Sequence, residues 1–420
     1  MVKHSRASAM SKFLTRDRFG QPQVLAGLLL LVLAGQCLWL LTRGSSPLDV
    51  DSAQLFRVQE GIRQWRGEGI AGTPAAERLE APSGPPAEIA ENQGYDPEHS
   101  PLWYLLASVA FAGSPDRPMI GSVQHWGWLA RLPYTVCGVL LGASLWYVAR
   151  RLYGNAGGFV ALSLYCFSPP IIRSSTLWLA EPNMPAAWGT FAAVFTAIAV
   201  AHTLYAPREV VLWNWRRTLL LGVSLAIAIG SQFSMIVLVP VALVFLLYVA
   251  PVRRRAGLVI WLAACAVGLL VFLSFYFFHL HAFAASMRCA DFWDLDWHGL
   301  AMLGAYKSIG AEIGRACPAL ALLAPVALAT YAVWPRTRYF GNTAPLVVGA
   351  LFVALALAHP NAVQGGFLLA TVPFLFIFVA GVLADLMQTR YSRPVAACVV
   401  ALLAVYILRS LIALAHVPRG

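Results

Sequence analysis

Long apolar runs separated by short polar turns dominate the hydrophobic pattern of the chain. The first run, residues 22–41, has about twenty residues, enough for a helix to cross the ~30 Å hydrocarbon core of a bilayer. Ten further runs follow, at 130–149, 156–172, 185–204, 218–233, 234–250, 257–279, 316–334, 344–359, 367–387 and 394–414. The pattern predicts an all-α fold, a polytopic transmembrane bundle of about eleven helices.

Arginines fall on alternate turns between these runs. They are Arg150 and Arg151, Arg208 with Arg216 and Arg217, Arg253 to Arg255, Arg336 and Arg338, and Arg390 and Arg393. Turns of this kind lie in the cytoplasm. The alternation supports eleven spans, with the N-terminus in the cytoplasm and the C-terminus in the periplasm of a bacterial inner membrane. Residues 218–250 must form two spans if the later arginine-rich turns are to stay on the cytoplasmic side. One long tilted helix is the alternative for this region.

The polar stretches divide the chain into a predicted domain order. It runs from a basic cytoplasmic N-terminus (1–21) to an N-terminal membrane module (22–205) with an outer loop at 44–129, and then to C-terminal membrane helices (206–414) with an outer loop at 280–315.

Two short helices are expected in the first outer loop. Residues 102–113 are apolar but too few to span, which predicts a helix at, or re-entering, the membrane surface. Earlier in the loop, Leu55, Val58 and Ile62 recur at helical spacing and would share one face.

The amino-acid composition also indicates a membrane protein, and it bears on which binding partners are expected. The chain is 59% hydrophobic and only 12% charged, whereas soluble domains carry about 25% charged residues. The net charge of +11 would suggest nucleic acid in a soluble protein. Here the basic residues lie in membrane-flanking turns, so the lipid bilayer is the expected partner and nucleic acid is not.

The spacing of the seven cysteines predicts neither a metal site nor a disulfide framework. None forms a CxxC pair, and most lie inside apolar runs. Only Cys289 and Cys317 flank an outer loop where they could pair, and a disulfide is not expected.

Acidic residues on the outer face are the candidates for catalysis. Asp49 and Asp51 follow the first span, and Glu181 lies at the outer end of the third. Asp51 has two interpretations, a helix N-cap or a general base at the membrane surface. Glu181 is either a loop acid in water or a functional acid beside the membrane.

The second outer loop raises a metal site as one option. Its acids and histidines are suitable ligands, but Asp291, Asp294 and Asp296 alternate with aromatic residues as in an interfacial segment. No metal ligands are therefore assigned, and a divalent metal is the less favoured alternative. The chain has no P-loop, dinucleotide fingerprint, zinc-protease motif or nucleophile elbow in a fitting context, which disfavours ATP-driven transport and serine hydrolysis.

Several short motifs occur in a fixed order. The series begins with Asp49-Val50-Asp51-Ser52 and His99-Ser100-Pro101-Leu102-Trp103-Tyr104-Leu105-Leu106, and continues with Arg131-Leu132-Pro133, Ala149-Arg150-Arg151-Leu152-Tyr153-Gly154, Ser168-Pro169 and Glu181. In this order the chain resembles the GT-C membrane glycosyltransferases, in the branch of protein O-mannosyltransferases and lipid A aminoarabinose transferases. The resemblance covers residues 20–205 well and the rest weakly.

The resemblance implies transfer of a sugar from a polyprenyl-phosphate donor to an acceptor lipid, polysaccharide or protein on the outer face. It implies Asp51 as base, Asp49 as reserve base and Glu181 as an orienting acid. Candidates for binding substrate or its phosphate are Arg57, His99, Arg131, Lys307 and Arg315. The lipid-phosphate-linked sugar is the donor substrate, and no cofactor is otherwise expected.

Two departures from the family pattern leave other functions open. Ser52 follows Asp51 where the family has Glu, and Gly366-Phe367 replaces a common Arg-Tyr pair. A non-catalytic GT-C-like scaffold subunit of a membrane complex is one alternative. A transporter or flippase of a lipid-linked solute is the other, although it would need polar residues near the bilayer midplane.

Overall fold

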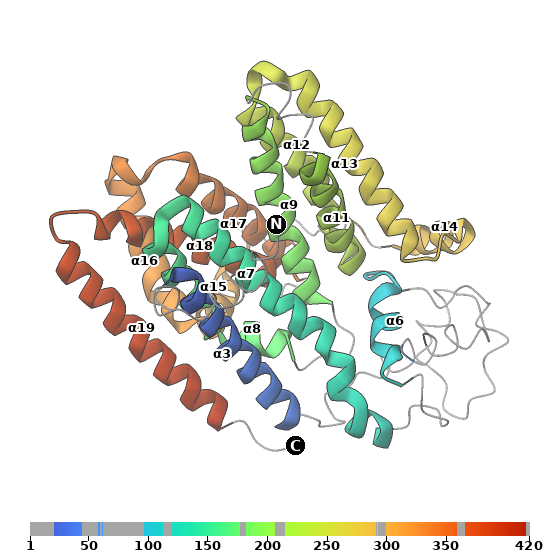
Figure 1. The fold of residues 1–420 in the computed structure, drawn as a ribbon, viewed down its shortest axis with the longest axis horizontal. Coiled ribbons are helices and arrows are strands. Elements are labelled where there is room, and N and C mark those ends of the chain that lie inside the picture. Colours follow the sequence, from blue (N-terminus) through green and yellow to red (C-terminus); the bar gives the residue numbers. More distant parts are fainter. Residues whose placement is uncertain are drawn as a thin grey trace, which may run out of the picture.

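The fold is helical throughout the part of the chain that is described. The computed structural model describes residues 21–43, 58, 61, 96–111, 120–176, 182–205, 215–290, 292, 300–358 and 366–416. Across these ranges the regular elements are α-helices and short 3-10 helices, without a strand (Figure 1). Seven helices are long and apolar enough to cross a membrane. The predicted all-α, polytopic membrane fold is therefore confirmed.

The seven long helices are α3 (Pro22–Arg43), α7 (Ile120–Cys166), α9 (Asn183–Thr203), α13 (Arg254–Ser274), α17 (Phe340–Ala358), α18 (Phe367–Met387) and α19 (Ser392–Ala415). The shorter helices are α6 (Leu102–Val109), α8 (Pro169–Ser174), α11 (Trp215–Ser231), α12 (Leu238–Val249), α14 (Leu280–Cys289), α15 (Leu303–Ala316) and α16 (Pro318–Val333). Three 3-10 helices join them, η4 (Phe233–Val237), η5 (Pro251–Arg253) and η7 (Pro335–Thr337).

Helix α7 is a hairpin of two helices that contains the second predicted span and most of the third. Its backbone turns at Gly154, where φ is +76°, a conformation that glycine adopts without the Cβ clash of other residues. Beyond the turn the two arms run back along each other. The Tyr165 hydroxyl donates to the Gly138 carbonyl at 2.6 Å, and Thr135 Oγ1 donates to the Ser175 carbonyl at 2.7 Å.

The region 218–250 also forms two helical segments, as the charge alternation required. Helix α11 ends at Ser231, the extended residue Gln232 interrupts it, and η4 and α12 follow. Every predicted apolar run thus lies on a helix. Because α11, α12 and α16 are shorter than the other spans, the number of eleven crossings stays a prediction.

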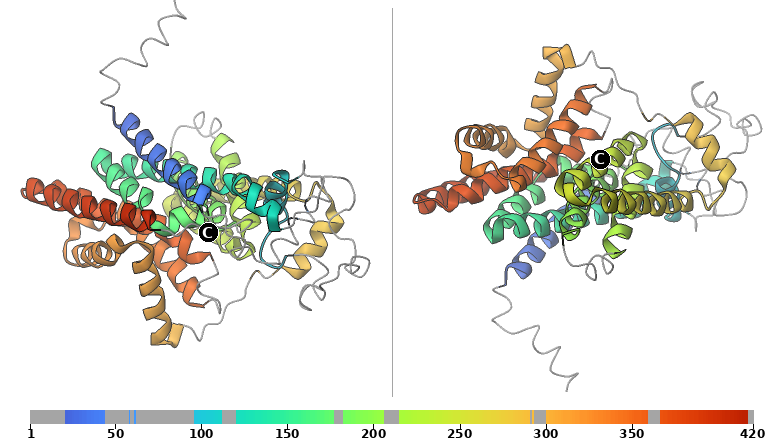
Figure 2. Two further views of the ribbon diagram at one scale, coloured as in Figure 1. Left: turned by 90° about the horizontal axis from the view of Figure 1, so that it is seen from below. Right: turned by 90° about the horizontal axis from the view of Figure 1, so that it is seen from above.

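Helix α18 forms the centre of the bundle, and α19 lies at its edge (Figures 1 and 2). Within its most apolar window α18 is 83% buried, whereas α19 is 17% buried. Aromatic rings from α7, α9, α16 and α17 pack around α18, as the 5.5 Å contact of Phe191 with Phe374 and the 6.1 Å contact of Phe352 with Phe367 illustrate. Offset or tilted ring pairs of this kind stabilise cores.

Small residues allow α9, α11 and α13 to approach closely. A Cβ on Gly189 of α9 would lie 2.6 Å from the backbone nitrogen of Ala228 in α11. A Cβ on Gly222 of α11 would lie 2.6 Å from the carbonyl oxygen of Ala264 in α13. Because lipid gives little hydrophobic drive for helix association, such backbone proximity is how membrane helices gain packing energy.

The arginine-bearing turns gather at one end of the bundle. Tyr153, just after Arg151, donates to the carbonyl of Gly341, just after Arg338, at 2.6 Å. The ring of Tyr248, just before the Arg253 turn, stacks 6.3 Å from that of Phe340 in the same later turn. The intervening turns, including Gly230 and Gly366, lie at the opposite end, called the outer end below. The structure therefore supports the alternation of turns, while the assignment of the arginine end to the cytoplasm stays a prediction.

Candidate functional site at the outer end

The turn before α6 is fastened to the outer end of the bundle by backbone hydrogen bonds. The Ser100 N–H donates to the Gly230 carbonyl at 3.0 Å, and the Phe233 N–H donates to the Glu98 carbonyl at 2.8 Å. These contacts join the first outer loop to the break between α11 and η4. The two segments are far apart in sequence, so the site exists only in the folded chain.

Helix α6 is the short helix that the sequence predicted within 102–113, and it packs on the first arm of α7. Trp103 lies 5.9 Å from the ring of Tyr134. A small apolar cluster of Tyr104, Phe111, Ala130 and Val58, with Ala107, fills the contact. Val58 is fully buried there, whereas Leu55 and Ile62, which are expected on the same helical face, lie outside the described residues.

Asp96 is the acceptor at the centre of the turn. Its Oδ1 accepts the Glu98 N–H at 2.9 Å, and its Oδ2 lies 3.1 Å from Nδ1 of His99. The hydroxyl of Tyr104 on α6 donates to the same Oδ2. Charge-assisted hydrogen bonds of this kind are the stronger ones in proteins. Asp96 therefore fixes the imidazole of His99 against the start of α6.

Arg131 brings a buried cation to the same contact. Its side chain is 1% exposed, and it follows Ala130, which packs with Tyr104 in the cluster under α6. A guanidinium stays charged in proteins, and burying it is costly unless acceptors surround it. A cation held in this way near the membrane surface suits a phosphate or a carboxylate.

The other predicted site residues are either outside the described residues or away from the contact of α6 with α7. Asp49, Asp51, Arg57 and Glu181 lie outside the described residues. Arg315 is on α15, but its side chain is outside the described part. Lys307 is also on α15 and is exposed, so it is not built into the buried contact of α6 with α7.

The structure explains why glycine stands at position 366, where the family that the sequence resembles commonly has an Arg-Tyr pair. Gly366 caps the start of α18 with a left-handed φ of +65°, and a Cβ there would overlap the side-chain oxygen of Gln232. The next residue, Phe367, is buried against Phe352. This position therefore presents no cation to a substrate, unlike the Arg-Tyr pair common in the family.

Neither metal ligands nor disulfides organise the described part of the site. Within the described ranges, no three His, Cys, Asp or Glu side chains gather as metal ligands. All seven cysteines are free, Cys289 and Cys317 included. Asp291, Asp294 and Asp296 of the second outer loop lie outside the described residues.

Asp96 and Tyr104 are site residues that sequence reasoning did not select. The Asp-x-x-His spacing of Asp96 and His99 was a usable signal, because residues three apart in a tight turn can meet. The role of Tyr104 as a hydrogen-bond donor to Asp96 becomes visible only once α6 is packed in the structure. Chemically, the outer end combines an oriented imidazole with a buried guanidinium, a combination that can hold an anionic group and neutralise charge on it.

The architecture defines an integral membrane protein with a short helix set against its first helical hairpin. Residues 120–278 match a protein family described as dolichyl-phosphate-mannose-protein mannosyltransferase. The match begins at α7, includes Arg131 and extends past α13. No curated protein matches the sequence.

Two solved structures share the fold. The oligosaccharyltransferase of Archaeoglobus fulgidus in its apo form aligns with 94% of this chain and 56% of its own, at 12% identity and a TM-score of 0.56. The oligosaccharyltransferase AglB of the same organism, in complex with an inhibitory peptide and a dolichol-phosphate, aligns with 95% and 56%, at 11% identity and a TM-score of 0.54. The chain thus spans just over half the length of these structures. Together the family match and the fold confirm the resemblance to GT-C membrane glycosyltransferases.

Proposed function

We propose that this protein is a membrane glycosyltransferase that moves a sugar from a polyprenyl-phosphate donor to an acceptor on the outer face of the membrane. The match of residues 120–278 to the mannosyltransferase family carries the proposal. The dolichol-phosphate bound to AglB supports a donor of the same chemical class. Because such a donor is confined to the bilayer, its phosphate lies at the depth of the membrane surface, which is the depth expected of His99 and of Arg131 at the start of the second predicted span.

The reaction is a single displacement at the anomeric carbon. The acceptor hydroxyl oxygen bonds to that carbon, the bond from the carbon to the phosphate oxygen breaks, and the configuration inverts. Asp51 takes the hydroxyl proton as general base, with Asp49 in reserve, and Glu181 orients a substrate. Cationic residues neutralise the charge on the departing lipid phosphate.

Among the candidates for that neutralisation, Arg131 and His99 have the best structural support. Arg131 is buried on α7, next in sequence to Ala130 of the contact with α6, and Asp96 orients His99 in the turn before α6. Arg57, Lys307 and Arg315 are the further candidates. Catalysis gains most from charges that are already in position before the reaction begins, so we rank the exposed Lys307 below the buried Arg131.

A scaffold subunit is the second candidate, and the start of α18 favours it. Glycine at 366 and the closely placed Gln232 leave no cation where the family commonly has one. A transporter has less support. Among the described residues the buried charged side chains are Asp96, Arg131 and Asp385, and Asp385 lies two residues from the end of α18, so none is near the middle of a span.

Deleting the gene and complementing it with point variants tests the proposal. Asp51→Asn is compared with Glu209→Gln, a matched acid-to-amide change on the expected cytoplasmic side. Membrane levels are equalised, and the glycans of cell-surface polymers and lipids are profiled. We expect the deletion to remove one glycan, Glu209→Gln to restore it and Asp51→Asn to leave it absent.

Two other results would contradict the proposal. Unchanged glycans in the deletion strain would overturn a role in glycosylation. A glycan lost on deletion but restored equally by Asp49→Asn, Asp51→Asn and Glu181→Gln would overturn the catalytic proposal and support the scaffold.

A further inference from the structure

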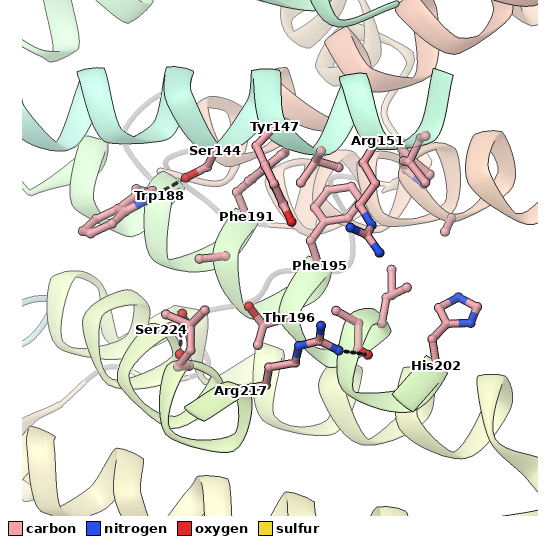
Figure 3. Close-up of a pocket in the computed structure, with 18 of the residues that line it drawn as sticks. Ser144, Tyr147, Arg151, Trp188, Phe191, Phe195, Thr196, His202, Arg217 and Ser224 are labelled. Carbon is pink, nitrogen blue, oxygen red and sulfur yellow. Dashed lines mark hydrogen bonds between the residues drawn. The ribbon is translucent and has the colours of Figure 1, made fainter. Parts of the chain in front are cut away.

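A large apolar cavity opens on the opposite half of the bundle from the α6 site. It has a volume of about 1020 Å³ and lies between α7, α9, α11 and α17 (Figure 3). Small-molecule pockets commonly measure about 300–1,000 Å³, so this one is at the upper end. The aromatic side chains of Trp188, Phe191 and Phe195 on α9 line one wall.

Three basic side chains surround the arginine end of this cavity. Arg151 of α7 and Arg217 of α11 extend toward each other from opposite walls, and His202 of α9 lies at the same end (Figure 3). Arg217 Nη1 donates to the Ala199 carbonyl at 3.3 Å, which fixes the guanidinium at the opening.

Among the described residues, no carboxylate lies within ion-pair distance of Arg151, Arg217 or His202. The ion pairs found there join His99 to Asp96 and Glu98 at the far end of the molecule. Tyr339 also lines the cavity. Its burial and the nearby Asp385 carboxylate raise the pKa of the Tyr339 phenol to about 12, so the phenol is neutral at physiological pH. The opening therefore attracts an anion.

The depth of the cavity matches one leaflet of a bilayer. Arg151 and Leu140 mark its two ends on α7, and the eleven residue steps from one to the other correspond to about 16 Å at 1.5 Å per residue. That is about half of a ~30 Å hydrocarbon core. The deep polar groups are already satisfied, since Ser144 donates to the Leu140 carbonyl at 2.8 Å and accepts from Trp188 Nε1 at 3.4 Å. The deep part is thus suited to hydrocarbon.

We propose that this cavity binds one anionic phospholipid from the leaflet on the arginine side of the membrane. The lipid phosphate lies between Arg151, Arg217 and His202, and an acyl chain runs along the aromatic wall of α9. Basic pockets between helices on the cytoplasmic side are the sites that favour anionic headgroups. The proposal is independent of sugar transfer, because a donor for the outer end would enter from the other leaflet.

Native mass spectrometry of the detergent-purified full chain tests the site. The protein is titrated with dioleoyl-phosphatidylglycerol, and with dioleoyl-phosphatidylcholine, which has the same chains and no net charge. The double variant Arg151→Gln/Arg217→Gln is compared with Arg254→Gln/Arg255→Gln, which removes two exposed arginines at the same end but outside the cavity. A third variant, Ala192→Phe, fills the cavity and keeps both arginines.

We expect the double variant in the cavity to bind phosphatidylglycerol about 30-fold more weakly, since each arginine near an anionic headgroup contributes about 1 kcal/mol and 1.4 kcal/mol is tenfold. The control should bind like the unaltered protein, and Ala192→Phe should lose binding. Equal binding of the two lipids, equal weakening in both double variants, or competition by inorganic phosphate alone would overturn the proposal. If the double variant does not purify as a folded protein, unchanged binding by Ala192→Phe is still sufficient to overturn it.

Discussion

Replacing Gly366 with alanine tests whether Gln232 fills the start of α18. The change has two costs. A left-handed backbone disfavours a residue with a Cβ by about 1–2 kcal/mol, and the new Cβ overlaps the Gln232 side chain, where overpacking costs about 1–3 kcal/mol. We therefore expect Gly366→Ala to lower the free energy of unfolding by about 2–5 kcal/mol.

A double-mutant cycle separates these two costs. In a Gln232→Ala background only the backbone cost of about 1–2 kcal/mol should remain. Unfolding of the detergent-purified protein by denaturant, followed by tryptophan fluorescence, gives the free energies. Gly35→Ala is the matched control, since its φ is not positive and a Cβ there would meet nothing within 4 Å.

Either of two results would refute this explanation of the missing Arg-Tyr pair. If Gly366→Ala is as stable as the unaltered protein, the left-handed conformation is not required. If its cost is the same with and without the Gln232 side chain, Gln232 does not fill the position that a larger family residue would occupy.

Three further predictions concern the packing around the two ends, each measured as the free energy of unfolding in detergent. Asp96→Ala should cost about 2–4 kcal/mol because it removes the carboxylate that accepts from the Tyr104 hydroxyl and the Glu98 N–H; a neutral effect would show that the turn is held by its backbone alone. Tyr153→Phe should cost about 1 kcal/mol through loss of its bond to the Gly341 carbonyl, and a larger loss at unchanged fold would contradict that figure. Gly222→Val should cost about 1–3 kcal/mol by separating α11 from α13, whereas equal stability would mean that the helices can move apart freely.

The helices were predictable because a bilayer imposes a simple physical rule. Each spanning segment must satisfy its backbone internally and present apolar side chains, so hydropathy locates it. The same rule identified α6 as too short to span. The charge alternation resolved the pair α11 and α12, whose separation at Gln232 has no strong hydropathy signal of its own.

The tertiary details were not predictable, because they depend on pairs of residues distant in sequence. Gly366 was visible as a departure, but its cause is the side chain of Gln232. Arg151 and Arg217 served only as indicators of topology, and their convergence on one cavity follows from the packing of α7 against α9 and of α9 against α11. The sequence indicated His99 and Arg131 as binding residues, but not that Asp96 orients the first or that the second is buried.

Turnover of a lipid-linked donor by the purified full chain tests the central claim most directly. A set of radiolabelled polyprenyl-phosphate sugars is presented in liposomes with membrane extract as the source of acceptor, and release of polyprenyl phosphate is measured. The account predicts that one donor is consumed, that Asp51→Asn abolishes the reaction, and that Arg131→Gln slows it strongly. If the extract supports turnover by a known transferase of the same donors but not by this protein, the claim of catalysis is contradicted.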